Sequence, residues 1–122
     1  MATSILREKT FEFAVKIVKF CKKLREVYKE FEISHQLHNS GTAPGALTRE
    51  AQFAESTLDF KHKLNIALKE ANESVYWLDL ISATIPDLQE EALALKRDCG
   101  EIVVMLVSST KTIKEKGLKK SR

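Results

Sequence analysis

Hydrophobic residues recur at spacings of three and four along almost the whole 122-residue chain, and no stretch alternates as a β-strand does. This spacing is typical of α-helices that bury one face, because 3.6 residues complete a turn. It predicts four helices, over residues about 4–30, 33–53, 56–83 and 87–115. We therefore expect an all-α fold, an antiparallel up-down four-helix bundle over residues 1–115, followed by a basic tail over residues 116–122.

The first predicted helix carries two apolar rows. Its core row consists of Leu6, Phe13, Ile17, Phe20, Cys21, Leu24, Val27, Tyr28 and Phe31. A narrower row, made of Phe11, Val15 and Val18, lies well away from the core side. Single exposed apolar residues are common on soluble proteins, but three large aligned ones favour a surface that contacts another molecule.

The third predicted helix opens with Ser56-x-x-Asp59, a pattern typical of a capping box. Its core row consists of Phe60, Leu64, Ala67, Leu68, Ala71, Val75 and Leu78. A second face mixes Ile66, Tyr76, Trp77 and Leu80 with charged residues, as in a helix buried on two sides. The pairs Asp59 with Lys63 and Lys69 with Glu73 are four residues apart and can form ion pairs along the helix. Together, the first and third helices predict an oligomer interface of Phe11, Val15, Val18, Asp59, Lys63, Ile66, Glu70, Glu73, Trp77 and Leu80.

The second predicted helix is the least regular, because Gly41, Pro44 and Gly45 interrupt an otherwise helical phase over residues 33–53. Two interpretations remain: a Gly-Pro loop between two short helices, or one kinked helix whose small residues press close against neighbours. We favour the kinked helix.

Ile85-Pro86-Asp87 predicts a tight turn into the fourth helix. The core row of that helix consists of Leu88, Ala92, Leu95, Cys99, Ile102, Val103, Leu106 and Ile113.

The composition is that of an ordinary globular chain, with 43% hydrophobic and 30% charged residues. The net charge of +3 conceals an asymmetry, since residues 1–30 hold eight basic and four acidic side chains and residues 111–122 hold six and one. Basic side chains can displace counterions from a nucleic-acid backbone. The candidate nucleic-acid contacts are Lys16, Lys19, Lys23, Lys111, Lys114, Lys119 and Lys120. A solvated helix end, whose lysines complement the helix dipole, is the simpler interpretation of the C-terminal group.

A four-helix bundle invites a dimetal-carboxylate site, which requires Glu-x-x-His pairs that point inward. The chain offers Glu32-x-x-His35 and Asp59-x-x-His62, but both histidines lie off the core rows. We therefore expect no metal at the bundle centre. Glycine-rich phosphate loops, Gly-x-Ser-x-Gly and Cys-x-x-Cys are also missing from the sequence. The sequence predicts neither an enzyme nor a bound cofactor.

Cys21 and Cys99 both fall on core rows. If the first and fourth helices run antiparallel between Ile5 and about Glu115, residues whose numbers add to 120 lie level, which would bring the two cysteines close. We expect buried apolar thiols.

The longest apolar run covers only residues 102–107, whereas a membrane span needs about 20 residues. The first ten residues are unlike an export signal, so we expect a cytoplasmic protein.

Three stretches are too specific for a generic bundle. They are Ile33-Ser34-His35-Gln36-Leu37, Ser40-Gly41-Thr42 and Asp59-Phe60-x-His62-Lys63-Leu64-x-Ile66-Ala67-Leu68-Lys69-Glu70-Ala71-Asn72-Glu73-x-x-Tyr76-Trp77-Leu78. From Phe11 to about Lys114 the chain resembles the bacterial four-helix bundle proteins first noticed as products of intervening sequences in 23S ribosomal RNA genes. It departs from that pattern at Asn39, where arginine is common, and at residues 46–50, where Ala-Asn-Ile or Ala-Asn-Val usually precedes an acidic residue. The loss of a basic side chain beside Ser40 weakens any phosphate contact there.

The resemblance implies an up-down four-helix bundle that assembles into a ring-shaped homopentamer, with no agreed catalytic or ligand-binding residues. Such a ring would act as a scaffold or adaptor, without a small-molecule substrate or a membrane. The alternative is a nucleic-acid-binding accessory factor for RNA or DNA. It rests on a related fold among the accessory proteins of diversity-generating retroelements, whose pentamers bind nucleic acid and a reverse transcriptase.

Overall fold

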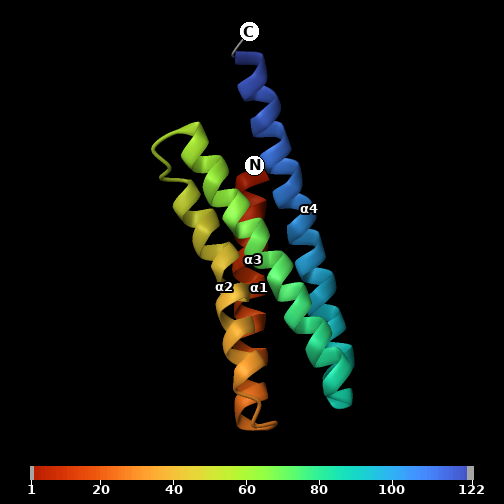
Figure 1. Ribbon diagram of the computed structural model, residues 1–122. Helices are drawn as coiled ribbons and strands as arrows, with labels where there is room; N and C mark the ends of the chain where they lie inside the picture. The colour runs from red at the N-terminus through yellow and green to blue at the C-terminus, as the bar shows by residue number, and fades with distance from the viewer. Residues whose placement is uncertain (1, 121–122) are drawn as a thin grey trace.

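Four long helices and one short 3₁₀ turn make up the computed structural model, which describes the backbone of residues 2–120 and the side chains of residues 4–112. The elements are α1 (Ala2–Glu26), α2 (Glu32–Ala51), α3 (Thr57–Thr84), η1 (Pro86–Leu88) and α4 (Gln89–Lys120). Each helix runs antiparallel to the next (Figure 1). Neighbouring helices pack together, α4 closes the bundle against α1, and α1 and α3 occupy one diagonal of the described bundle. The all-α up-down four-helix bundle is therefore confirmed.

The core takes one apolar row from each helix, and most of the predicted core residues are buried. Val27 and Phe31 are exceptions, with 66% and 58% of their surfaces exposed. The prediction was wrong for both because α1 ends at Glu26 rather than near residue 30. Beyond that point Lys29 adopts a left-handed conformation, with φ of 55°, so the helical phase is lost before Phe31.

Helix α2 runs without a break through Pro44, so the prediction of one helix rather than two is confirmed. Its glycines explain why. A Cβ atom on Gly41 would lie 2.8 Å from Cγ2 of Ile17, and one on Gly45 would lie 3.4 Å from the backbone oxygen of Thr10. The small residues let α2 approach α1 at backbone distance, and this packing compensates for the poor helix propensity of glycine and proline.

Helix α3 begins with the predicted capping interaction. The hydroxyl of Ser56 accepts a hydrogen bond from the backbone N–H of Asp59 at 3.0 Å, and the carboxylate of Asp59 accepts one from the N–H of Glu55 at 3.2 Å. Asp59 is thereby committed to the cap. Lys63 pairs instead with Glu50 of α2, at 3.4 Å, so the expected Asp59–Lys63 pair does not form.

Ion pairs set the register of α1 against α4. Lys16 lies 2.9 Å from Asp98, and Lys23 pairs with Glu91, so residues whose numbers add to about 114 lie level. The expected sum of 120 was too large. Cys21 and Cys99 are therefore about six residues out of level, which corresponds to about 9 Å along the helix axis. Both cysteines are buried free thiols, as predicted.

Candidate interaction surface on α1 and α3

The second apolar row of α1 lies on the surface of the bundle. Phe11, Val15 and Val18 leave 52%, 37% and 43% of their surfaces exposed. Next to them, the guanidinium of Arg49 on α2 lies 5.2 Å from the centre of the Phe11 ring, in a cation–π contact. Phe11 and Arg49 also line a shallow surface hollow of about 570 Å³. We call the set of Phe11, Val15 and Val18 the α1 row.

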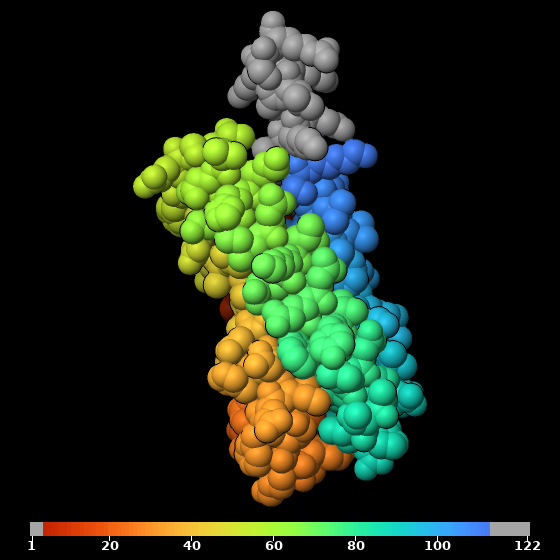
Figure 2. Space-filling model, viewed as in Figure 1, coloured from red at the N-terminus to blue at the C-terminus, as the bar shows by residue number. Residues whose placement is uncertain are grey.

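The second face of α3 is only partly covered by the rest of the chain. Ile66, Trp77 and Leu80 are half-buried, whereas Tyr76 and Glu73 are exposed. The Tyr76 and Trp77 rings meet edge to face, with centroids 5.0 Å apart, which holds both aromatic side chains in place. We call the set of Ile66, Glu70, Glu73, Trp77 and Leu80 the α3 face. Figure 2 shows α3 in front of the molecule with α2 beside it.

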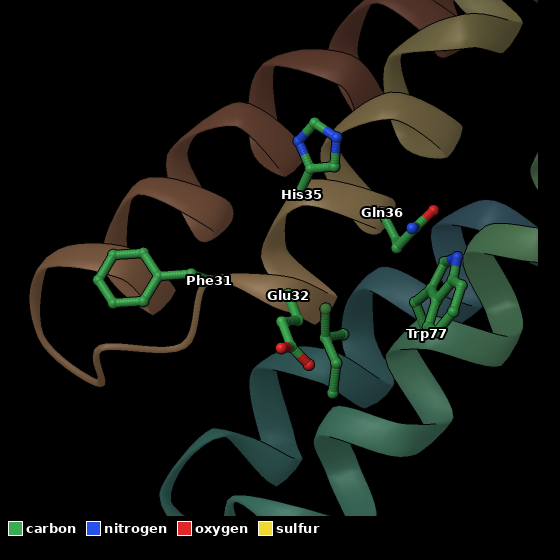
Figure 3. Close-up of a pocket in the computed structure, with 6 residues that line it drawn as sticks. Phe31, Glu32, His35, Gln36 and Trp77 are labelled. Carbon is green, nitrogen blue, oxygen red and sulfur yellow. The ribbon is translucent and has the colours of Figure 1, made fainter.

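Trp77 also borders a groove between α3 and the start of α2. The groove has a volume of about 550 Å³ and is lined by Phe31, Glu32, Ile33, His35, Gln36 and Trp77. Figure 3 shows Trp77 on α3 across from the first turns of α2. The indole N–H of Trp77 is buried, yet it has no hydrogen-bond acceptor among the residues whose side chains are described. A buried donor of this kind is costly until an acceptor or water reaches it.

Acidic side chains gather on the same face. Burial raises the pKa of Glu70, and the negative charge of Glu73 raises it further, whereas Lys69 lowers it. Glu70 and Glu73 thus repel each other at the surface. A cation brought from outside the chain would relieve this repulsion.

The predicted nucleic-acid contacts on α1 are mostly engaged within the bundle. Lys16 donates to the carboxylate of Asp98, and this hydrogen bond, together with the charge of Asp98, raises the pKa of Lys16. Lys23 pairs with Glu91. Lys19 is exposed, and no acidic side chain of residues 4–112 lies within ion-pair distance of it. Lys111 is exposed, whereas Lys114, Lys119, Lys120 and the predicted tail over residues 116–122 fall outside the described side chains.

The histidines of the two Glu-x-x-His-like motifs lie at the surface. His35 contacts the side chain of Asn39 at 3.4 Å, and His62 is exposed. Among residues 4–112, no three His, Cys, Asp or Glu side chains come together as metal ligands would. Burial raises the pKa of Cys21 to about 11 and that of Cys99 to about 12, so neither thiol is ionised at neutral pH.

Two features of the structure were missed from the sequence. Inside the bundle, the hydroxyl of Ser74 on α3 donates to that of Ser40 on α2 at 2.9 Å. The only signal in the sequence is that Ser74 falls on the core side of α3, three residues after Ala71. On the outside of α4, Leu93, Val104 and Val107 leave 38%, 69% and 46% of their surfaces exposed.

Within the described part of the chain, no helix is apolar and long enough to cross a lipid bilayer.

Comparisons with known proteins agree with this architecture. Residues 3–108 match the family model described as 23S rRNA-intervening sequence protein. The chain is also similar to a crystal structure from Bacteroides thetaiotaomicron, described as a protein of unknown function from the S23 ribosomal protein family. The two chains are 45% identical, with a TM-score of 0.88 over 91% of this chain and 99% of the other. Among curated proteins, no sequence relative matches.

Proposed function

Because the chain belongs to the 23S rRNA-intervening sequence protein family, we propose that it is a non-catalytic subunit of a ring-like homo-oligomer. The ring serves as a scaffold or adaptor for another macromolecule. A pentamer is the subunit number that the family resemblance implies. Self-association is the molecular activity of the proposed subunit.

The observation that carries the proposal is the exposed α1 row. Full burial of a Val or Phe side chain is worth roughly 1.5–3 kcal/mol relative to leaving it exposed, and each of these three residues retains a third to a half of that exposure. The α3 face adds a second surface with a tryptophan, the residue type most enriched at the centres of interfaces. The non-catalytic part rests on the cysteines, which are the strongest nucleophiles in the chain and are buried and protonated.

The test is a pair of matched substitutions at exposed valines on two different helices. Val15→Glu places a charge in the α1 row, and Val104→Glu places the same charge on exposed α4. We expect light scattering to show that Val15→Glu lowers the particle mass to that of one chain, while Val104→Glu keeps the mass of the unsubstituted protein. Circular dichroism should show equal helix content in both variants. Equal masses for the two variants would contradict the proposal.

The alternative of an RNA- or DNA-binding accessory factor has less support. Two of the three candidate lysines on α1, Lys16 and Lys23, are compensated by acidic residues of α4, and of these three candidates Lys19 alone has no acidic partner among the described side chains. Sequence-independent binding to phosphates requires several uncompensated cations and weakens with salt. A salt-sensitive gel shift with structured RNA, lost in Lys19→Glu, would favour the alternative over a pure scaffold.

A further inference from the structure

We propose that the outer side of α4 binds an acidic amphipathic helix of a partner protein. The inference rests on the proposed adaptor function and adds which surface holds the partner and what chemistry that partner has. This surface lies apart from the α1 row and the α3 face. Arg49 of α2 contacts the α1 row, and Trp77 faces the start of α2. Helix α4, by contrast, makes no contact with α2 in the described bundle (Figure 1).

A row of residues follows the outer side of α4 at alternating spacings of four and three residues. We call this row the α4 stripe; it consists of Leu93, Arg97, Gly100, Val104, Val107 and Lys111. Every member except Gly100 is exposed, and Val104 leaves 69% of its surface uncovered. The same spacing produces the buried row of α4, from Ala92 to Leu106. Two rows with this spacing are typical of a helix that packs against other helices on two sides.

Gly100 stands in the middle of the α4 stripe without a reason inside the chain. A Cβ atom at this position would meet no atom within 4 Å, and glycine weakens the interior of a helix. The missing side chain lets the backbone of a second helix approach closely, as Gly41 does where α2 packs on α1. Such a helix would also cover Leu93, Val104 and Val107, which lie on either side of Gly100.

The uncompensated charges of the α4 stripe are positive. Arg97 and Lys111 are exposed, and neither has an acidic side chain within ion-pair distance among residues 4–112. Asp98 and Glu101 are the acidic residues between Leu93 and Lys111. Both are on the side of α4 that faces α1, since each pairs with an α1 lysine. A partner on the outer side therefore meets cations that lack a carboxylate.

Helix α3 adds a further cation beside the α4 stripe. Asp79 pairs with Lys96 of α4 at 2.8 Å, which identifies the side of α3 that faces α4. Lys61 lies eighteen residues before Asp79, or five helical turns, and is therefore on the same side. It has no ion-pair partner among the described side chains. Asn65 and Asn72, between them on that side, are neutral. Charge complementarity thus selects an acidic partner over a basic one.

The apolar members of the α4 stripe favour a protein helix over a nucleic acid. Phosphates would pair with Arg97 and Lys111 but would leave Leu93, Val104 and Val107 in water, whereas an amphipathic helix covers both kinds of residue. Arg97 and Lys111 are fourteen residues apart, or about 21 Å along the helix. A matching partner helix carries an apolar row with a small residue near its centre and two carboxylates at that separation.

Binding of a synthetic helix tests the inference. The probe is a fluorescently labelled amphipathic peptide with a leucine row, an alanine near its centre and two glutamates at the separation of Arg97 and Lys111. A second peptide has lysines in place of the glutamates. Fluorescence anisotropy should show that the full chain binds the acidic peptide at least about tenfold more tightly than the basic one. Arg97→Glu combined with Lys111→Glu should invert this preference.

Two further substitutions separate the apolar contact from charge alone. Val104→Glu should weaken binding of the acidic peptide at least about tenfold, whereas Val27→Glu, at a valine of nearly equal exposure outside α4, should not. Gly100→Leu should also weaken binding, although a Cβ there meets no atom of the chain. Circular dichroism should show unchanged helix content in all three variants. If Val104→Glu and Gly100→Leu bind the peptide as tightly as Val27→Glu does, the inference is wrong.

The outcomes also distinguish this inference from the proposed function. A protein that assembles but does not bind the acidic peptide keeps the proposed self-association and loses the α4 contact. Binding of structured RNA that depends on Arg97 and Lys111 but not on Val104 or Gly100 would identify a phosphate-binding surface and overturn the protein-helix contact. A monomeric protein that binds the acidic peptide through the α4 stripe would overturn the ring and support the α4 contact.

Discussion

At the scale of single residues, the packing of the bundle depends on where a glycine takes the place of a residue with a side chain. Gly41 and Gly100 both lie inside helices, yet their surroundings are opposite. A methyl group on Gly41 would collide with the buried Ile17 side chain, whereas one on Gly100 would find no atom within 4 Å. Glycine costs about 1 kcal/mol relative to alanine in a helix interior. At Gly41 this cost is compensated by close packing, and at Gly100 it is not.

The two glycines therefore predict opposite effects of the same substitution. Gly100→Ala should raise the free energy of unfolding by up to about 1 kcal/mol, because it gains helix propensity without a clash. Gly41→Ala should lower it by about 1–2 kcal/mol, because Ile17 has no room to move in the packed core. Urea denaturation followed by circular dichroism measures both. A stabilised Gly41→Ala would mean that α1 and α2 are not packed this closely.

The cysteines predict slow thiol chemistry. With pKa values raised to about 11 for Cys21 and about 12 for Cys99, neither forms a thiolate at pH 8, and both are buried. A thiol-specific reagent should modify neither residue within minutes at pH 8 and should count two thiols after denaturation. Because folding raises these pKa values, the related stability is complete below about pH 8 and is lost as the pH rises toward 11–12. Rapid modification of either thiol in the folded protein would contradict the buried placement.

At the scale of elements, α2 is the helix that local propensity alone would not form. It contains Pro44 and two glycines, and its first residue follows Phe31, whose side chain provides no cap. The carboxylate of Glu30 substitutes for the cap by accepting a hydrogen bond from the N–H of Ser34 at 2.8 Å. Close contact with α1 on one side and the Ser40–Ser74 hydrogen bond to α3 on the other hold the helix in place.

The Ser40–Ser74 contact predicts a measurable coupling between α2 and α3. Ser40→Ala and Ser74→Ala should each lower the free energy of unfolding by about 1 kcal/mol, because each removes one partner of a buried hydrogen bond. The double variant should lose at least 0.5 kcal/mol less than the sum of the two, as roughly expected for groups in direct contact. A double-mutant cycle in urea measures the difference. Fully additive losses would show that the two hydroxyls act independently.

The helices and their core rows could be predicted because periodic apolar spacing is a local property of the sequence. The capping box at Ser56 was equally local. The early end of α1 was not predictable, since Lys29 adopts its left-handed conformation without the glycine that usually signals one. The α1–α4 register and the pairing of Lys63 with Glu50 depend on offsets between helices, which no spacing within one helix reveals. For the same reason, the spacing did not show that two residues of the predicted interface are engaged within the chain, Asp59 in the cap of α3 and Lys63 with Glu50.

At the scale of the whole molecule, the bundle buries one face of each helix and leaves further apolar side chains at the surface of α1, α3 and α4. The α1 row and the α3 face belong to two helices that occupy one diagonal of the described bundle. Under the proposed self-association, neighbouring copies would cover the α1 row and the α3 face. The proposed scaffold function follows from assembly rather than from chemistry within one chain.

The most direct test of this account is the mass of the unsubstituted protein in solution, measured by light scattering during gel filtration at micromolar concentration. The account predicts one species with a mass several times the 13.8 kDa of one chain, and close to five times if the ring is a pentamer. A single species of 13.8 kDa, with Trp77 emission at the wavelength of an indole in water, would contradict it.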